Sequence, residues 1–233
     1  MASQQNTILI VGASRGIGLG LVDEHLRRGW NVIATVRDQQ HPTQLHRLAE
    51  QQGSGRLEIE TVDINVPEQV SGLRDRLQSR LLDVLFVNAG VGSPTTAMGG
   101  VSTDEFMRVM VTNTLSPMRV IEAFSELVKP NGVIAAMSSG LGSVANNETG
   151  GWEVYRASKA ALNTSLRSFA ARQNSPEAAI LALAPGWVRT DMGGPDAMLD
   201  VATSVRGLAD VIESRRGARG VAYLDYQGHV LPW

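Results

Sequence analysis

The stretch TILIVGASRGIG, from Thr7 to Gly18, decides the fold. An apolar run of five residues leads directly into three glycines spaced G-x3-G-x-G, and an amphipathic stretch follows. In a strand–turn–helix context, Gly12 allows a tight turn, Gly16 lets the backbone approach a pyrophosphate, and Gly18 lets the helix pack on the strand. The positive end of that helix would face the pyrophosphate. The motif therefore predicts a dinucleotide-binding unit.

Two other motifs overlap this glycine loop. A P-loop is excluded because no Lys-Ser/Thr pair follows the last glycine. The letters around Ser14 also satisfy G-x-S-x-G, the nucleophile elbow of α/β-hydrolases, and His229 could be offered as its base. That fold needs several strands before the elbow, and only eleven residues precede Gly12. A hydrolase that uses Ser14 stays a remote alternative.

Seven short apolar runs recur along the chain, with helix-length amphipathic segments between several of them. Continuous rather than alternating apolar runs are typical of parallel strands buried on both faces. The pattern predicts an α/β protein of Rossmann type, a doubly wound, seven-stranded parallel sheet with helices on both faces. No linker or repeat divides it, so residues 1–233 are expected to form a single domain. The runs are 7–11, 31–36, 57–62, 82–87, 133–137, 180–184 and 221–224.

Composition excludes several functional classes. The 233 residues are 43% hydrophobic and 19% charged, which is typical of a globular protein. Cysteine is absent, so a disulfide framework or thiolate chemistry is excluded. The net charge of −2 argues against nucleic acid or an anionic membrane as a partner. The start has no signal-peptide pattern, which favours a soluble cytoplasmic protein, and the four histidines lack metal-ligand spacing.

The end of the second apolar run indicates which dinucleotide binds. A site for NAD usually carries an acid about 20 residues past the glycines, where it bonds the ribose hydroxyls. Val36 stands at that place and Arg37 follows it. A guanidinium can bind the 2′-phosphate of NADP(H), and Arg15 in the glycine loop could supply a second one. NADP(H) is therefore favoured, although Asp38 could bond the ribose if the strand ended later.

Further short motifs follow in a fixed order, and with them the whole chain resembles the short-chain dehydrogenase/reductase family. The stretches YRASKAALN, PGWVRTDMGG and LDYQGHVLPW are most similar to its small carbonyl-reductase branch of C-factor-like and sniffer-like proteins. The matching positions are Asp63 with Ile64, Asn88-Ala89-Gly90, Asn113, Ser138-Ser139, Tyr155 with Lys159, and Pro185-Gly186-Trp187-Val188-Arg189-Thr190.

The resemblance implies an NADPH-dependent reduction of a ketone or aldehyde to an alcohol. It also implies which residues are catalytic and which bind the cofactor. The catalytic set is Asn113, Ser139, Tyr155 and Lys159. The cofactor set is Gly12, Ser14, Arg15, Gly16, Ile17, Gly18, Arg37, Asp63, Ile64, Asn88, Ala89, Gly90, Tyr155, Lys159, Pro185, Gly186, Val188 and Thr190.

The chemistry of such a site is consistent with these residue types. Tyr155 and Lys159 are four residues apart and so share one face of a helix. A free phenol has a pKa near ~10, and a nearby ammonium would favour its ionised form. Ser139 would polarise the substrate carbonyl, Tyr155 would deliver the proton, and Asn113 would hold a water that links Lys159 to solvent.

The serine assignment departs from the usual family spacing. That spacing would place the serine at position 142, which is Gly142. Ser139 is preferred because it stands directly before the glycine-rich loop, while Ser138 and Ser143 stay open. Ser138 is expected to face the other side, since side chains alternate along a strand.

Two expectations concern binding surfaces. Trp152 and Trp187 flank the expected site and could line an apolar substrate pocket, or could only anchor their loops. The stretches 104–127 and 152–172 are expected to pair across a two-fold axis in a homodimer. That expectation relies on the apolar pattern of the first stretch, which consists of Phe106, Val109, Met110 and Val120.

A cofactor-binding sensor or interaction protein without turnover is the alternative function.

Overall fold

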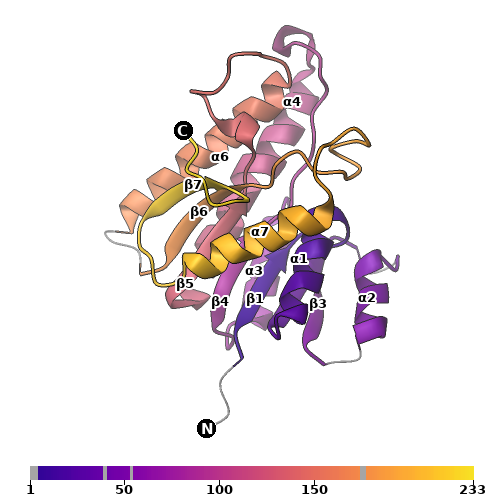
Figure 1. Cartoon of the computed structure of the whole chain (residues 1–233), viewed down its shortest axis with the longest axis vertical. Helices are drawn as coiled ribbons and strands as arrows, with labels where there is room; N and C mark the ends of the chain where they lie inside the picture. Colours follow the sequence, from indigo (N-terminus) through magenta and orange to yellow (C-terminus); the bar gives the residue numbers. More distant parts are fainter. Residues whose placement is uncertain (1–4, 39–40, 53–54, 174–176) are drawn as a thin grey trace.

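In the computed structural model, which describes residues 5–38, 41–52, 55–173 and 177–233, seven strands form one parallel sheet (Figure 1). Their order is β3-β2-β1-β4-β5-β6-β7, which makes this the doubly wound, seven-stranded parallel sheet that the apolar runs predict. The strands are β1 (Thr7–Val11), β2 (Asn31–Val36), β3 (Leu57–Thr61), β4 (Leu82–Val87), β5 (Val128–Met137), β6 (Ala179–Ala184) and β7 (Val221–Asp225).

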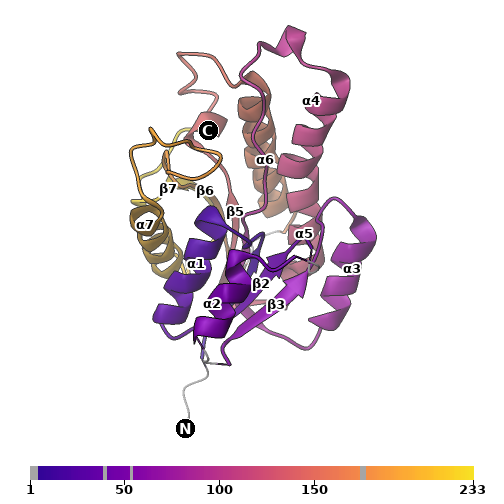
Figure 2. The ribbon, with the colours of Figure 1, turned by 90° about the vertical axis from the view of Figure 1, so that its right-hand side faces the viewer.

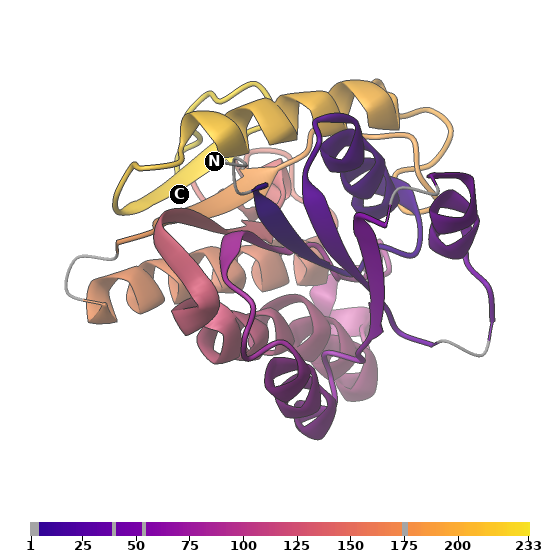
Figure 3. The same cartoon turned by 90° about the horizontal axis from the view of Figure 1, so that it is seen from below.

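Helices cover both faces of the sheet, which explains why the inner strands are apolar along their length. All six residues of β4 and all six of β6 are buried. Figure 3 shows the two helical layers. One layer contains α1 (Gly16–Arg27), α2 (Gln44–Gln52) and α7 (Val201–Ser214). The other contains α3 (Pro67–Arg76), α5 (Ser116–Phe124) and α6 (Glu153–Arg172).

The expected helix over 104–127 is divided into four elements in the structure. Helix α4 (Thr103–Met110) passes into a π-helical turn (Val111–Leu115), α5 then begins at Ser116, and a 3-10 turn (Ser125–Leu127) ends the stretch. A π turn inside a helix often marks a functional site. Two of the four apolar side chains expected at a dimer face, Val109 and Val120, are buried in the protein itself.

Two further elements differ from the sequence expectation. Strand β5 begins at Val128, five residues before the predicted start, because Val128 pairs with Leu82 and the register then shifts before Val84. The Pro130 and Gly132 that this segment contains are typical of a turn, and pairing with β4 overrides that local preference. Helix α2 is not predicted by the apolar pattern.

The loops that follow the strands gather at one end of the sheet, beside the first turn of α1 and the upper half of α6 (Figures 1 and 2). This is the edge where open α/β sheets bind ligands. Across the described ranges of the chain, no helix has the length and apolar character needed to cross a membrane.

Candidate active site

The glycine loop is held between two neighbouring strands. The main-chain N–H of Gly12 donates to the hydroxyl of Thr35 on β2 at 3.0 Å. On the other side, the side-chain amide of Asn88, just after β4, donates to the carbonyl of Gly12 at 2.6 Å. Gly12 has a φ of 91°, and a Cβ there would lie 2.8 Å from the main chain of Ala89. Only glycine fits between these strands.

The first turn of α1 is free to bind an anion. Its N-cap residue, Arg15, makes no side-chain capping bond, and no acidic residue lies in the first turn. A Cβ at Gly18 would lie 2.2 Å from the carbonyl oxygen of Gly12, so the helix approaches the loop as closely as the motif predicts. Ser14, between the loop and the helix, and Ile17, in its first turn, are partly exposed. Unsatisfied N–H groups at a helix N-terminus suit the pyrophosphate of a dinucleotide.

At the end of β2, Val36 is 1% exposed and packs in the core on the α1 side, so this position offers no carboxylate to a ribose. Arg37, the next residue, is exposed. Arg15 is also exposed, and it forms an ion pair with Asp191 of the loop after β6, with Nη1 and Oδ2 2.8 Å apart. Both guanidinium groups are therefore at the surface, and that of Arg15 is already paired with a carboxylate.

The ends of β3 and β4 place the next group of predicted cofactor residues. The carboxylate of Asp63 accepts the N–H of Asn65 at 2.9 Å, and Ile64 beside it is buried. Asn88 and Ala89 both donate their main-chain N–H groups to the carbonyl of Val11 at 2.9 Å, which fixes the turn that leads to Gly90.

Asn113 lies in the π turn between α4 and α5 and is fully buried. Its side-chain oxygen accepts the N–H of Val91, and its amide donates to the carbonyl of Val91 and to the hydroxyl of Ser158. The side chain therefore ties the loop after β4 to helix α6. Its role in holding a water beside Lys159 stays a prediction.

The structure separates the three candidate serines. Ser139, directly after β5, forms a side-chain hydrogen bond with Tyr155. Ser138 points into the interior, where its hydroxyl donates to Asn163 Oδ1 at 2.7 Å. Ser143 is buried and accepts the N–H of Asn146 at 3.1 Å. Only Ser139 therefore shares a hydrogen bond with Tyr155 among these three.

Tyr155 and Lys159 lie on the inner face of α6, at the carboxyl end of β5. The Lys159 ammonium donates to the carbonyl of Met137 at 2.9 Å and lies 5.7 Å from the centre of the Tyr155 ring. Burial raises the pKa of Tyr155, and the hydrogen bond with Ser139 partly offsets the rise. This is opposite to the lowering expected from a nearby ammonium. The phenol is therefore protonated at neutral pH, as a proton donor must be.

Burial lowers the pKa of Lys159 to about 8. A lysine in the unfolded chain has a pKa of ~10.4. Between pH ~8 and pH ~10, the unfolded chain therefore binds more protons at this residue than the folded protein does, and the free energy of unfolding rises with pH. We expect Lys159→Met to abolish this rise, which amounts to at most about 3 kcal/mol. Urea unfolding across this pH range measures it. Lys129→Met should keep the rise, and an equal rise in Lys159→Met would contradict the assignment.

The loop after β6 holds the last predicted cofactor residues. Gly186 has a φ of 81°, and a Cβ there would lie 2.4 Å from Leu199. Pro185 accepts a hydrogen bond from Ser204 of α7, and Val188 bridges Leu199. Thr190 accepts the N–H of Gly193 at 3.1 Å and lies near Gly16, since a Cβ on that glycine would be 3.5 Å from Thr190. The loop therefore reaches back to the glycine loop.

The hydrolase alternative does not survive the geometry. His229 follows β7 and pairs with Asp225, whereas Ser14 follows β1. Four strand spacings separate β1 from β7, roughly 19 Å, so His229 cannot act as a base for Ser14. Within the described residues, no group of three or more His, Asp or Glu side chains could hold a metal ion.

Two residues that support the site are not identified by the sequence motifs. Thr35 holds the glycine loop by accepting the N–H of Gly12, and Ser158 holds Asn113 by accepting its amide N–H. They stand directly before Val36 and Lys159 in the sequence. Their hydroxyl groups beside such positions are the only signal in the sequence that could have identified them.

The chain belongs to the short-chain dehydrogenase family, because residues 6–197 match the family model described as short chain dehydrogenase. It is therefore an oxidoreductase of that family. The match confirms the family expected from the ordered motifs.

Three proteins are similar to the chain over most of its length. C-signal from Myxococcus xanthus is 40% identical over 154 residues, which are 65% of this chain and 93% of that protein. A crystal structure from Burkholderia multivorans, of a protein named for the short-chain dehydrogenase/reductase family and bound to NADP, is 52% identical with a TM-score of 0.95. It covers 99% of this chain and 100% of its own. A carbonyl reductase from Pseudomonas aeruginosa PAO1 in complex with NADP is 38% identical, with a TM-score of 0.91 and the same coverage.

Proposed function

We propose that residues 1–233 form a single domain that reduces a ketone or aldehyde to an alcohol with NADPH. The observation that carries this proposal is the hydrogen-bonded pair of Ser139 and Tyr155, with buried Lys159 beside it, at the same sheet edge as an uncapped glycine loop. The Pseudomonas carbonyl reductase, which is similar over nearly the whole chain and was solved with NADP, supports the same activity.

The residues of the sheet edge suit a bound NADP(H). The glycine loop and the first turn of α1 would hold the pyrophosphate, and Arg37 with Arg15 would hold the 2′-phosphate. Asp63 would bond the adenine, and Thr190 the carboxamide of the nicotinamide. When bound, the nicotinamide supplies a hydride.

The protein's own residues supply the proton and orient the carbonyl. The Ser139 hydroxyl donates a hydrogen bond to the substrate oxygen and polarises the carbonyl. The Tyr155 phenol, protonated because burial raises its pKa, gives its proton to the alkoxide as that charge develops. Lys159 provides positive charge beside the phenol and favours the phenolate left behind.

Several large hydrophobic side chains on the loops after β5 and β6 are exposed, and a ligand bound at this edge of the sheet could bury them. They are Val144, Trp152, Trp187, Met192 and Met198. We therefore expect an uncharged, apolar carbonyl substrate.

The experiment that tests the function is NADPH oxidation by the purified protein with a panel of aldehydes, ketones and 1,2-diketones. We expect turnover that increases with the apolar size of the substrate. Tight binding of NADPH without turnover on any compound would instead favour a sensor or interaction protein.

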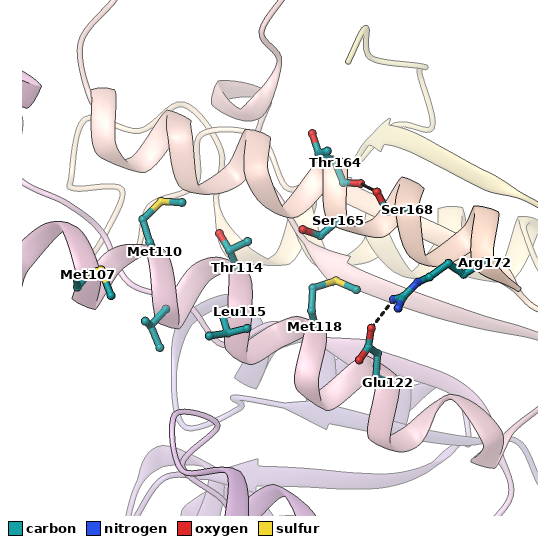
Figure 4. Close-up of a pocket in the computed structure, with 11 residues that line it drawn as sticks. Met107, Met110, Thr114, Leu115, Met118, Glu122, Thr164, Ser165, Ser168 and Arg172 are labelled. Carbon is teal, nitrogen blue, oxygen red and sulfur yellow. Dashed lines mark hydrogen bonds and ion pairs between the residues drawn. The ribbon is translucent and has the colours of Figure 1, made fainter.

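We also propose that the protein is a homodimer through α4, α5 and α6. A groove of about 470 Å³ runs between these helices, and Figure 4 shows methionine side chains lying along it, with an ion pair between Glu122 and Arg172 at one end. Met107 and Leu115 on this face are 52% and 45% exposed. A second copy related by a two-fold axis would cover the same apolar face on both subunits.

Leu115→Arg should convert this dimer to a monomer, because each subunit would place a charge at the apolar contact. Light scattering at micromolar concentration measures the mass of both proteins. Leu81→Arg is the control, since Leu81 is 59% exposed but lies away from the groove. A monomeric wild-type protein would refute the dimer.

A further inference from the structure

A second buried tyrosine, Tyr223, lies behind the site and has no part in the proposed reaction. Tyr223 of β7 is 1% exposed, and its hydroxyl donates to the main-chain carbonyl of Ser139. Ser139 is also the serine whose side chain meets Tyr155. Tyr223 therefore holds the backbone of the same residue whose hydroxyl faces the substrate.

The phenol of Tyr223 is part of a buried polar network. The side chains of Asn163 and Ser138 lie beside it and lower its pKa, and Ser138 donates to Asn163 at 2.7 Å. The Asn163 amide donates in turn to the carbonyl of Gly142 at 3.3 Å. The serine loop is thus fixed at two carbonyls, by strand β7 at Ser139 and by helix α6 at Gly142. A fully satisfied network of this kind specifies one loop conformation.

Trp233 covers this network from outside. The ring centroids of Tyr223 and Trp233 are 5.3 Å apart. The guanidinium of Arg167 also contacts the Trp233 ring, 4.9 Å from its centroid. The carbonyl of Trp233 accepts the N–H of Ala145 at 3.2 Å, and Leu231 donates to the carbonyl of Tyr223. Residues 231–233 therefore seal Tyr223 from water and hold the serine loop at a third point.

Tyr223 is a donor under all ordinary conditions. Burial raises its pKa to about 12, so the phenol keeps its proton throughout the range in which enzymes are assayed. Phenylalanine at this position would keep the ring packing but leave the carbonyl of Ser139 with the N–H of Gly142, at 2.8 Å, as its remaining donor. The hydrogen bond that ties this carbonyl to β7 would be lost, so the main chain at Ser139 would be held less firmly.

We propose that Tyr223, covered by Trp233, is a positioning residue that fixes the main chain of Ser139 so that its hydroxyl stays directed at Tyr155 and the substrate carbonyl. The inference depends on the proposed reductase function for its effect on rate. A small misplacement of a catalytic group costs up to about a hundredfold in rate. Cofactor binding should be unaffected, because none of these contacts involves the glycine loop.

The first test compares Tyr223→Phe with wild type in steady-state NADPH-dependent reduction, with active sites counted by NADPH titration. We expect kcat to fall by about tenfold, with the Kd for NADPH changed less than about twofold. Trp233→Ala should act in the same direction. Val230→Ala, in the same segment but 74% exposed, is the control and should match wild type.

A double-mutant cycle separates positioning from a general structural defect. If Tyr223 acts through Ser139, Tyr223→Phe should have no further effect in a Ser139→Ala background, because the hydroxyl it positions is gone. An equal fall in kcat in both backgrounds, or none in either, would overturn the proposal.

Amide hydrogen exchange provides a readout that does not need turnover. Exchange in the peptide containing residues 139–147 should be faster in Tyr223→Phe and in Trp233→Ala than in wild type or Val230→Ala. If the wild-type protein reduces no carbonyl compound, the proposed function fails and this measurement alone decides the inference. Unchanged exchange in both variants would then overturn it.

Discussion

Tyr155→Phe is expected to lower kcat for carbonyl reduction by at least ~10²-fold, because it removes the proton donor from the site. The ring still fills its place on α6, and the glycine loop is untouched, so the Kd for NADPH should stay close to that of wild type. Initial rates at saturating substrate, together with NADPH fluorescence titration, measure the two quantities separately.

Tyr226→Phe is the matched control for this change. It removes a phenol oxygen near the carboxyl end of β7, without touching Ser139 or Lys159, and should leave kcat within about twofold of wild type. Comparable rates for Tyr155→Phe and wild type would remove Tyr155 from the mechanism. A loss of NADPH binding in the same variant would show that its effect is structural rather than chemical.

Arg37→Asp should invert the cofactor preference. Each charged hydrogen bond to a phosphate is worth roughly 1.5–3 kcal/mol, so loss of the guanidinium alone, in Arg37→Ala, should raise the NADPH KM by about ten- to hundredfold. The aspartate adds repulsion against the 2′-phosphate and an acceptor for the ribose hydroxyls of NADH. Arg37 is the position to change, because a carboxylate at Val36 would be buried in the core.

Steady-state kinetics with both cofactors checks this prediction. Arg80→Ala removes the same charge from an exposed ion pair with Glu58 elsewhere on the sheet and should change neither KM. A wild-type protein that prefers NADH would contradict the assignment of Arg37. An Arg37→Ala variant that loses both cofactors equally would show that Arg37 supports the loop rather than the phosphate.

The sequence alone determined the class of protein, because the decisive signals are local. The spacing of Gly12, Gly16 and Gly18 reflects backbone approach around one strand–turn–helix unit, and the structure confirms the close contacts at Gly12 and Gly18. Tyr155 and Lys159 needed only helical spacing to share a face. The apolar runs predicted the seven strands, and the inner strands such as β4 and β6 are apolar throughout because both of their faces are buried.

The tertiary structure decided which neighbours meet. Ser138, Ser139 and Ser143 have the same chemistry in the sequence, and only the packing of β5 against α6 brings Ser139 to Tyr155. Local sequence likewise left open which way Val36 faces and hid the ion pair between Arg15 and Asp191, which are 176 residues apart.

The role inferred for Tyr223 depends on the same kind of long-range contact, between β7 and the end of β5. Spacing along the chain specifies contacts within a helix or turn. Contacts between strands and loops far apart in the sequence are specified only by the packed sheet, because their partners are brought together by the burial of the whole core.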